Sequence, residues 1–210
     1  MFVDIHSHKH PTDNNSIVIY NVPISQAEVV FSSDIKGFFS IGFHPWSTDI
    51  FSAELQEKMS HWIQDKRVIA IGECGLDKHS QVSLDKQTDI FEKQVRMSES
   101  IRKPLIIHCV GRFNELIDLK KRWNPAQQWI IHGFRGKPQL AEQALKAGIA
   151  LSFGEHFNAE SVKITPIESL FIETDESNIA VEEIYLKIAQ IKNCPVESLS
   201  AGEKLISERM

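Results

Sequence analysis

Short apolar segments alternate with amphipathic segments along this 210-residue chain, and this alternation constrains the fold more than any other feature. The apolar segments are rich in Ile, Val and Phe, and they predict strands at residues 2–6, 17–22, 38–43, 68–73, 105–109, 129–132, 149–153 and 170–173. The amphipathic segments predict helices at residues 51–66, 84–101, 113–122, 138–147, 181–191 and 196–208. Strands that alternate with helices form parallel sheets.

Eight predicted strands favour a closed (β/α)8 barrel, with an open doubly wound sheet as the alternative. The chain length is near the lower limit for such a barrel, and little room exists for a helix between the first two strands. We therefore predict an α/β protein with a TIM-type barrel that is trimmed or irregular in its N-terminal part. Residues 1–210 are expected to form a single domain.

Composition and charge exclude several classes of protein. The formal net charge of -5 disfavours a protein that holds nucleic acid mainly by neutralising phosphates, although bound metal ions would remove this objection. No apolar run approaches the ~18–20 residues needed to span a bilayer, and the first ten residues lack the features of a secretory signal. Three cysteines do not make a disulfide framework, so we expect a cytoplasmic protein. No stable protein partner is evident from the sequence.

The pattern His6-Ser7-His8 follows the first predicted strand. Residues two apart on a strand face the same side, so Asp4, His6 and His8 are expected to face inward, and Val3 and Ile5 to face helices. Two imidazoles at the carboxyl end of a barrel strand can bind a metal ion. The same pattern also occurs as two polar residues in a turn, so it is weak evidence alone.

Four other predicted strands end at possible metal ligands. Glu73, His108 and His132 come at or just after their strands, and the last strand runs into Glu173-Thr174-Asp175. The carboxyl ends of barrel strands meet at one face, where such barrels have their active sites. This donor set is too large for one tetrahedral zinc site and suits a pair of divalent ions that share a carboxylate. Mixed histidine and carboxylate ligands are compatible with Zn, Mn, Ni or Mg.

These motifs, taken in order, resemble those of the TatD family of metal-dependent hydrolases in the amidohydrolase superfamily. The resemblance runs from residue 2 to about residue 175, and the chain is similar to a short, trimmed member. Its motifs are His6-Ser7-His8, Gly42-Phe43-His44-Pro45, Gly72-Glu73-Cys74-Gly75-Leu76-Asp77, Ile107-His108, Ile131-His132-Gly133-Phe134 and Ile172-Glu173-Thr174-Asp175.

The resemblance implies a metal centre at the barrel mouth and roles for six residues. His6 and His8 would hold a first ion, His108 and His132 a second, Glu73 would bridge them, and Asp175 would contact the first ion and the attacking water. Glu73 and Asp175 are then the catalytic residues. The implied activity is phosphodiester hydrolysis by a deoxyribonuclease or 3′-exonuclease, with DNA as substrate.

Four departures from the family pattern bear on the substrate. His132 is followed by Gly133-Phe134-Arg135-Gly136 instead of Cys-Phe-Ser-Gly, and Asp175 by Glu176-Ser177-Asn178 instead of Ser-Pro-Tyr. Val110 stands where an arginine is usual, and the segment before Gly42 is shorter than usual. The alternatives are therefore a metal-dependent hydrolase of a small amide, ester or lactone, and a non-catalytic metal-binding paralogue.

Several polar and aromatic residues are candidates for substrate contact. Arg112 and Arg135 could bind phosphates, or could be surface arginines. His44 could support the ligands, donate to a substrate, or be structural. Trp46 could stack on a base. Trp62, on a predicted amphipathic helix, and Trp129, at the start of a predicted strand, are expected in the core.

Overall fold

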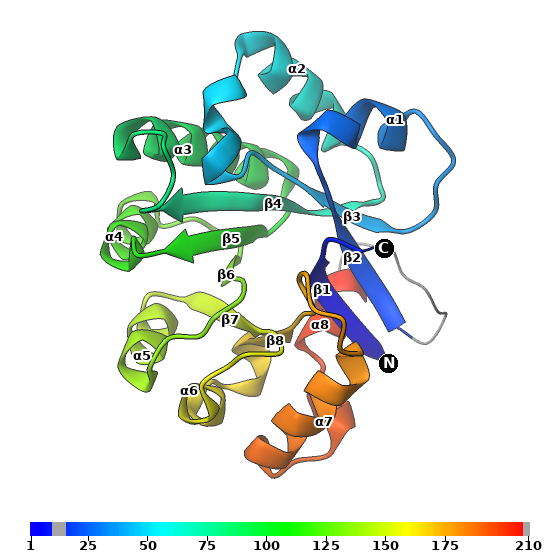
Figure 1. Ribbon diagram of the computed structural model, residues 1–210, viewed down its shortest axis with the longest axis vertical. Helices are drawn as coiled ribbons and strands as arrows, with labels where there is room; N and C mark the ends of the chain where they lie inside the picture. Colours follow the sequence, from blue (N-terminus) through cyan, green and yellow to red (C-terminus); the bar gives the residue numbers. More distant parts are fainter. Residues whose placement is uncertain (10–15, 208–210) are drawn as a thin grey trace. The chain divides into compact units, whose positions relative to one another are not determined.

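The structure is a computed structural model that describes residues 1–9 and 16–207. Its eight strands follow one another in the sheet in sequence order, β1 to β8 (Figure 1). They are β1 (Phe2–Ser7), β2 (Ser16–Val22), β3 (Phe38–Ile41), β4 (Val68–Asp77), β5 (Leu105–Val110), β6 (Trp129–Ile131), β7 (Ile149–Phe153) and β8 (Leu170–Ile172). Neighbouring strands pair in parallel, and the fold class is the predicted (β/α)8 barrel.

Helices connect the strands, and most of them match the predicted segments. The α-helices are α1 (Ala27–Phe31), α2 (Ala53–Trp62), α3 (Leu84–Ile101), α4 (Phe113–Trp123), α5 (Pro138–Lys146), α6 (Ala159–Ile164), α7 (Val181–Lys192) and α8 (Ala201–Ser207). The 3-10 helices are η1 (Ile24–Gln26), η2 (Pro45–Ile50), η3 (Ile167–Ser169) and η4 (Val196–Ser198). No helix among the described residues is long and apolar enough to cross a membrane.

The chain divides into two compact units. Unit 1 comprises Met1–Tyr20 and Ile130–Met210, and unit 2 comprises Asn21–Trp129. The polar loop expected around residues 11–16 and the side chain of His10 lie largely outside the described residues.

In unit 1, β1 presents alternate residues to opposite sides as its sequence predicts. Val3 and Ile5 face α8, where a Cβ added to Gly202 would lie 2.9 Å from the Cβ of Val3. The Tyr185 hydroxyl of α7 donates to the Val3 carbonyl at 3.0 Å, which fixes α7 against the same strand. Asp4 and His6 are buried on the other side of β1.

In unit 2, β4 is longer than the predicted segment and continues to Asp77. A Cβ on Gly75 would lie 2.0 Å from the His108 carbonyl oxygen, so only glycine permits this close pairing of β4 with β5. Two glutamines of α3 bind the neighbouring backbone. The side-chain oxygen of Gln87 accepts from the Asp77 amide at 2.8 Å, and that of Gln94 from the Phe43 amide at 2.7 Å.

Cys74 and two of the tryptophans are core residues. Cys74, Trp62 and Trp129 are buried. Burial raises the pKa of the Cys74 thiol well above its usual value and that of Cys109 to about 12. Both thiols are therefore protonated at neutral pH, and the thiolate form that binds metals is disfavoured.

Candidate metal centre

In unit 1, the backbone holds Asp175 beside the H-x-H motif. The Asp175 amide donates to the His6 carbonyl at 2.9 Å, and the His8 amide donates to the Asp175 carbonyl at 3.2 Å. Asp175 therefore forms a parallel β-bridge with Ser7, at a positive φ of 57°. Its Oδ1 atom lies 3.8 Å from Nε2 of His6 and 3.5 Å from Nε2 of His8.

The spacing of these three side chains fits a common cation. One possible ligand atom from each of His6, His8 and Asp175 lies within 4.8 Å of the others. Ligand atoms that share a tetrahedral zinc ion at usual bond lengths lie about 3.3 Å apart. Two imidazoles and a carboxylate also form a donor set that suits Zn, Mn or Ni.

Asp4 holds the residue that precedes Asp175. Its carboxylate accepts hydrogen bonds from the Thr174 amide at 3.0 Å, the Thr174 hydroxyl at 2.5 Å and the His6 amide at 3.2 Å. Burial raises the pKa of Asp4 to about 7, although the bonds from Thr174 and His6 oppose this shift. Asp4 thus links β1 to the end of β8 beneath the ligand cluster.

His132 of unit 1 is oriented by Glu173. The fully buried Oε1 atom of Glu173 accepts from the Gly133 amide at 2.6 Å and lies 3.3 Å from Nδ1 of His132. Burial raises the pKa of Glu173, but His132 and His6 lower it more, so the net pKa is below its usual value. A carboxylate can only accept, so neutral His132 carries its proton on Nδ1 and its lone pair on Nε2.

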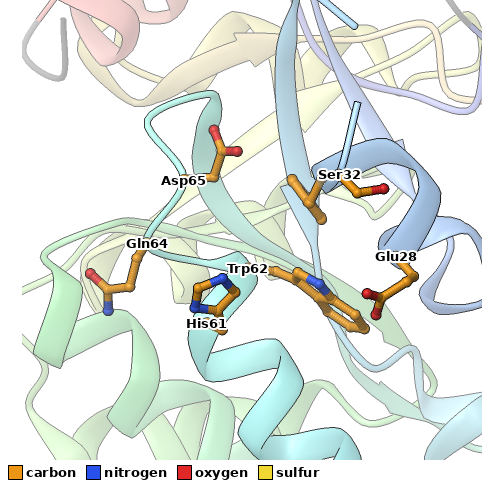
Figure 2. Close-up of a pocket in the computed structure, with 7 residues that line it drawn as sticks. Glu28, Ser32, His61, Trp62, Gln64 and Asp65 are labelled. Atoms are coloured by element: carbon orange, nitrogen blue, oxygen red, sulfur yellow. The ribbon is translucent and has the colours of Figure 1, made fainter. Parts of the chain in front are cut away.

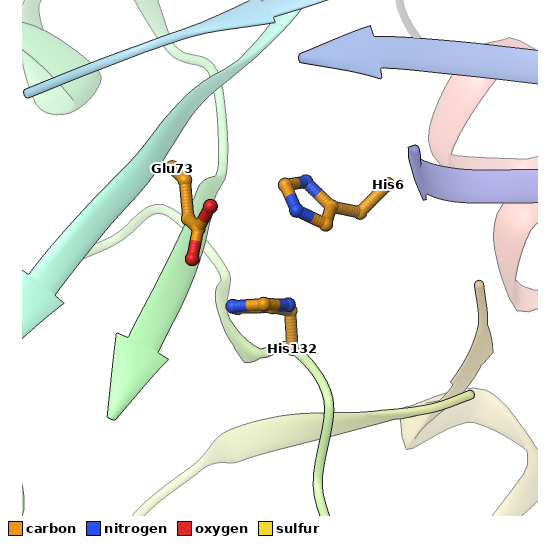
Figure 3. Close-up of side chains that lie close together, drawn as sticks. All are labelled: His6, Glu73 and His132. Carbon is orange, nitrogen blue, oxygen red and sulfur yellow. The ribbon is translucent and has the colours of Figure 1, made fainter. Parts of the chain in front are cut away.

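The rings of His6 and His132 lie together in the same unit. Their centroids are 4.5 Å apart, with the two imidazoles tilted by 53° (Figure 3). Together with Glu173 and Asp175, which lie within ligand-sharing distance of His132, they make unit 1 a cluster of imidazoles and carboxylates.

Unit 2 holds a second cluster, formed by His44, Glu73 and His108. Oε1 of Glu73 lies 2.7 Å from Nδ1 of His108 and 3.3 Å from Nε2 of His44. Glu73 is the last residue of the predicted part of β4, and His108 lies on the adjacent strand β5. One possible ligand atom from each of these three residues lies within 4.8 Å of the others, so the three residues could share a cation.

Asp77 lies against the other side of His108. Its Oδ2 atom is 2.9 Å from Nε2 of His108 and accepts from the indole N–H of Trp46 at 2.8 Å, while Oδ1 accepts from the His79 amide. Burial raises the pKa of Asp77, but these hydrogen bonds lower it more, so Asp77 is ionised at neutral pH. Both ring nitrogens of His108 therefore face carboxylate oxygens, Nε2 that of Asp77 and Nδ1 that of Glu73. A cation held between Nδ1 and Glu73 would require the neutral tautomer that donates from Nε2 to Asp77.

His44 has the opposite tautomer. Its Nδ1 atom accepts the amide hydrogen of Trp46 at 3.2 Å, so neutral His44 carries its proton on Nε2. That proton points to Oε1 of Glu73. This arrangement makes Nε2 of His44 a hydrogen-bond donor, which is compatible with two of its predicted roles, support of a ligand and donation to a substrate.

Sequence analysis places Asp77 in a motif and Glu173 at a strand end, but it assigns neither residue a role. Both orient a histidine, and both could have been found from strand periodicity. Asp77 is four residues beyond Glu73 on one strand, and Glu173 is two residues before Asp175. The strand was predicted to end at Glu73, so Asp77 was not placed on its inner face.

The two arginines have different surroundings. Arg112 is half-buried and pairs with Glu115 at 2.9 Å in the first turn of α4. Arg135 lines a cavity of about 210 Å³ in unit 1. The other lining residues come from the loops after β6, β7 and β8: Gly133, Gly154, Glu155, His156, Glu173, Thr174, Asp175, Glu176 and Ser177.

A separate cavity of about 410 Å³ in unit 2 contains none of the predicted site residues (Figure 2). It lies between α1 and the end of α2, before β4 begins. Its lining residues are Glu28, Phe31, Ser32, His61, Trp62, Gln64 and Asp65.

The chain matches a known protein family and several curated relatives. The family model of TatD-related DNases matches residues 21–204. An uncharacterized metal-dependent hydrolase of Bacillus subtilis, YabD, is 32% identical over 151 residues, which cover 66% of this chain and 58% of that protein. The 3′-5′ ssDNA/RNA exonuclease TatD of a Pantoea species is 25% identical, over 73% of this chain and 63% of that protein.

The solved structure of YjjV, a TatD homologue from Escherichia coli, has the same fold. It superposes with a TM-score of 0.78 at 17% identity and covers 99% of this chain and 96% of its own. The barrel and these relatives define the class, a metal-dependent hydrolase. Within that class the chain belongs to the family of TatD-related DNases. It spans less than two thirds of the length of the Bacillus and Pantoea relatives.

Proposed function

We propose that this chain hydrolyses phosphodiester bonds of nucleic acid, as a deoxyribonuclease or 3′-exonuclease. The observation that carries the proposal is the orientation of two histidines by carboxylates, His108 by Asp77 and His132 by Glu173. Carboxylates that fix the tautomer of a histidine are a regular feature of metal sites. The proposal treats residues 1–210 as one cytoplasmic hydrolase domain, without a stable protein partner.

The proposed ligands are the six that the family resemblance indicates. His6, His8 and Asp175 supply donors in unit 1 together with His132, and Glu73 and His108 supply donors in unit 2. The bridging role of Glu73, and the sharing of one ion by His108 and His132, rest on the resemblance. One or two divalent ions, of Zn, Mg, Mn or Ni, would supply positive charge that stabilises the phosphate oxygens and activates water.

The protein groups then have distinct tasks. Asp175 accepts the proton of the attacking water, because its carboxylate is partly exposed and adjoins both histidines of the H-x-H motif. His44 donates from Nε2 to a phosphate oxygen or to Glu73. Arg112 and Arg135 provide cationic contacts for phosphates away from the cleaved bond.

The test is metal-dependent cleavage of an end-labelled single-stranded DNA and of a generic phosphodiester. Metal-stripped protein is given Mg, Mn or Zn, and His108→Ala is compared with His61→Ala, a substitution of an exposed histidine of α2. Cleavage that His108→Ala abolishes and His61→Ala retains supports the proposal, and the product ladder separates exonuclease from endonuclease. Absence of cleavage by protein that binds metal would contradict it.

A second candidate is hydrolysis of a small amide, ester or lactone on the same scaffold. The cavity beside Asp175 favours it, since its volume of about 210 Å³ and its Arg135, Glu155 and His156 side chains suit a small polar molecule. If DNA is not cleaved, a screen of amides, esters and lactones with the same metals tests this candidate. A metal-binding paralogue without activity would fail both assays.

A further inference from the structure

Trp46 is an exposed aromatic side chain held in a fixed position beside the unit 2 cluster. Its exposed fraction is 62%, whereas Trp62 and Trp129 are buried. It is the one aromatic residue among the large hydrophobic side chains that are exposed in the described part of the chain. Single exposed apolar residues are common on protein surfaces, and Trp46 differs from them by its place beside candidate metal ligands.

Two hydrogen bonds fix the position of Trp46. Its indole N–H donates to Oδ2 of Asp77 at 2.8 Å, and its amide donates to Nδ1 of His44 at 3.2 Å. The polar edge of the ring is thus satisfied by the protein, and the exposed surface that remains is the apolar part of the indole. A side chain that is already ordered loses little conformational entropy on binding a ligand.

The ring stands next to residues of the proposed metal centre. The indole centroid lies 5.1 Å from that of His44 and 6.3 Å from that of His108, in both cases edge to face. A flat group stacked on Trp46 would therefore lie beside the unit 2 cluster of His44, Glu73 and His108.

Cationic side chains lie close to the same rim. Lys78 follows Asp77 directly, is exposed, and has its aliphatic stem against Gly111, the neighbour of Arg112. An aromatic surface combined with cations is the usual arrangement for single-stranded nucleic acid, in which bases stack and phosphates meet the cations.

We propose that Trp46 is a stacking surface for a nucleobase at the 3′ end of single-stranded nucleic acid. This inference rests on the proposed nuclease function and names the side chain that would hold an unpaired terminal base. A base in a duplex is stacked on its neighbours and would have to be unstacked first.

Two substitutions separate stacking from positioning of Asp77. Trp46→Phe keeps an aromatic ring but loses the N–H that binds Asp77, whereas Trp46→Ala loses both. Ile50→Ala, which removes another exposed apolar side chain of η2, is the matched control. The probes are a cleavage-resistant phosphorothioate oligodeoxythymidylate and the same strand with abasic sites at its last two 3′ positions.

Binding of the resistant strands is measured by fluorescence anisotropy. KM and kcat are measured on the cleavable strand, and bound metal is determined for each variant. We expect Trp46→Ala to weaken binding of the intact strand and to raise KM by about tenfold or more, the effect of losing one base stack. Trp46→Phe should retain most of the affinity, Ile50→Ala should match the wild type, and the abasic strand should bind the wild type and Trp46→Ala equally.

Three other outcomes would overturn the inference, and each has a different cause. Equal losses of kcat and bound metal in Trp46→Phe and Trp46→Ala, with KM unchanged, would assign Trp46 to positioning Asp77 alone. Wild-type protein that binds the abasic strand as tightly as the intact one, yet cleaves DNA, would refute stacking and leave the nuclease function intact. Wild-type protein that neither binds nor cleaves nucleic acid would remove both proposals.

Discussion

Asp175 is joined to Ser7 by a parallel β-bridge, although the two residues lie 168 positions apart in the chain. The bridge places the Asp175 carboxylate between the imidazoles on either side of Ser7. The bridge consists of backbone hydrogen bonds between Asp175 and the two histidines, so it does not depend on the side chain of Asp175. Its carboxylate can therefore be altered without dismantling the site.

Asp175→Asn should retain the fold and most of the bound metal but lose turnover by ~10²-fold or more, because the amide cannot accept the proton of the attacking water. Steady-state kinetics and metal analysis of the same preparation check this. Glu183→Gln, which changes an exposed carboxylate in the first turn of α7, is the control. Full activity in Asp175→Asn would refute the proton-acceptor role.

Asp77→Asn should weaken metal binding by about 10–100-fold, the usual effect of removing a carboxylate that orients a metal-binding histidine. The asparagine side chain can present its N–H₂ to His108 and so favour the wrong tautomer. Isothermal titration with Zn or Mn measures the affinity, and Asp118→Asn, on the exposed face of α4, is the control. Unchanged affinity in Asp77→Asn would show that Asp77 does not orient a ligand.

Thr174→Val should destabilise the metal-free protein by about 1–3 kcal/mol, because the buried Asp4 carboxylate loses the hydroxyl that donates to it. Thr174→Ser keeps that hydroxyl and should lose much less. Urea unfolding of the two variants provides the comparison. Equal losses in both would mean that the methyl group, and not the hydrogen bond, stabilises the end of β8.

The Asp65–Arg67 pair in unit 2 should make stability depend on pH. Arg67 donates to both carboxylate oxygens of Asp65 and lowers the pKa of that carboxyl below its usual value. A lowered pKa stabilises the fold above the unfolded value, about 3.9, and the contribution disappears as the pH falls through the folded value.

Asp65→Asn should accordingly cost up to about 1 kcal/mol at pH 6, and less at pH 3, because the pair is partly exposed. Unfolding free energies of the wild type and the variant at both pH values test the sign. A loss that is larger at pH 3 than at pH 6 would contradict the assignment.

The sequence predicts the repeating strands and helices because their apolar patterns are long and regular. Helix α3 has the predicted bounds, and β7 matches its segment. The short helices α1 and α6 were not predicted, since one or two turns contain too few residues to show a helical period. The long β4 was cut short because its second half contains glycine and charged residues.

Candidate ligands are predictable because they recur at strand ends, but their supporting contacts are not. Sequence periodicity places Asp4 and His6 on one face of β1. It cannot show that Nδ1 of His44 accepts from its own loop, or that Asp77 binds both Trp46 and His108. Those contacts depend on the meeting of separate segments in space.

The central claim is that these histidines and carboxylates bind divalent cations, and equilibrium dialysis of metal-stripped protein against Zn or Mn tests it most directly. The wild type and His61→Ala should bind one or two ions per chain, whereas His6→Ala and His108→Ala should each lose an ion or bind about tenfold or more weakly. A wild type that binds no ion, or variants that bind as the wild type does, would contradict the account.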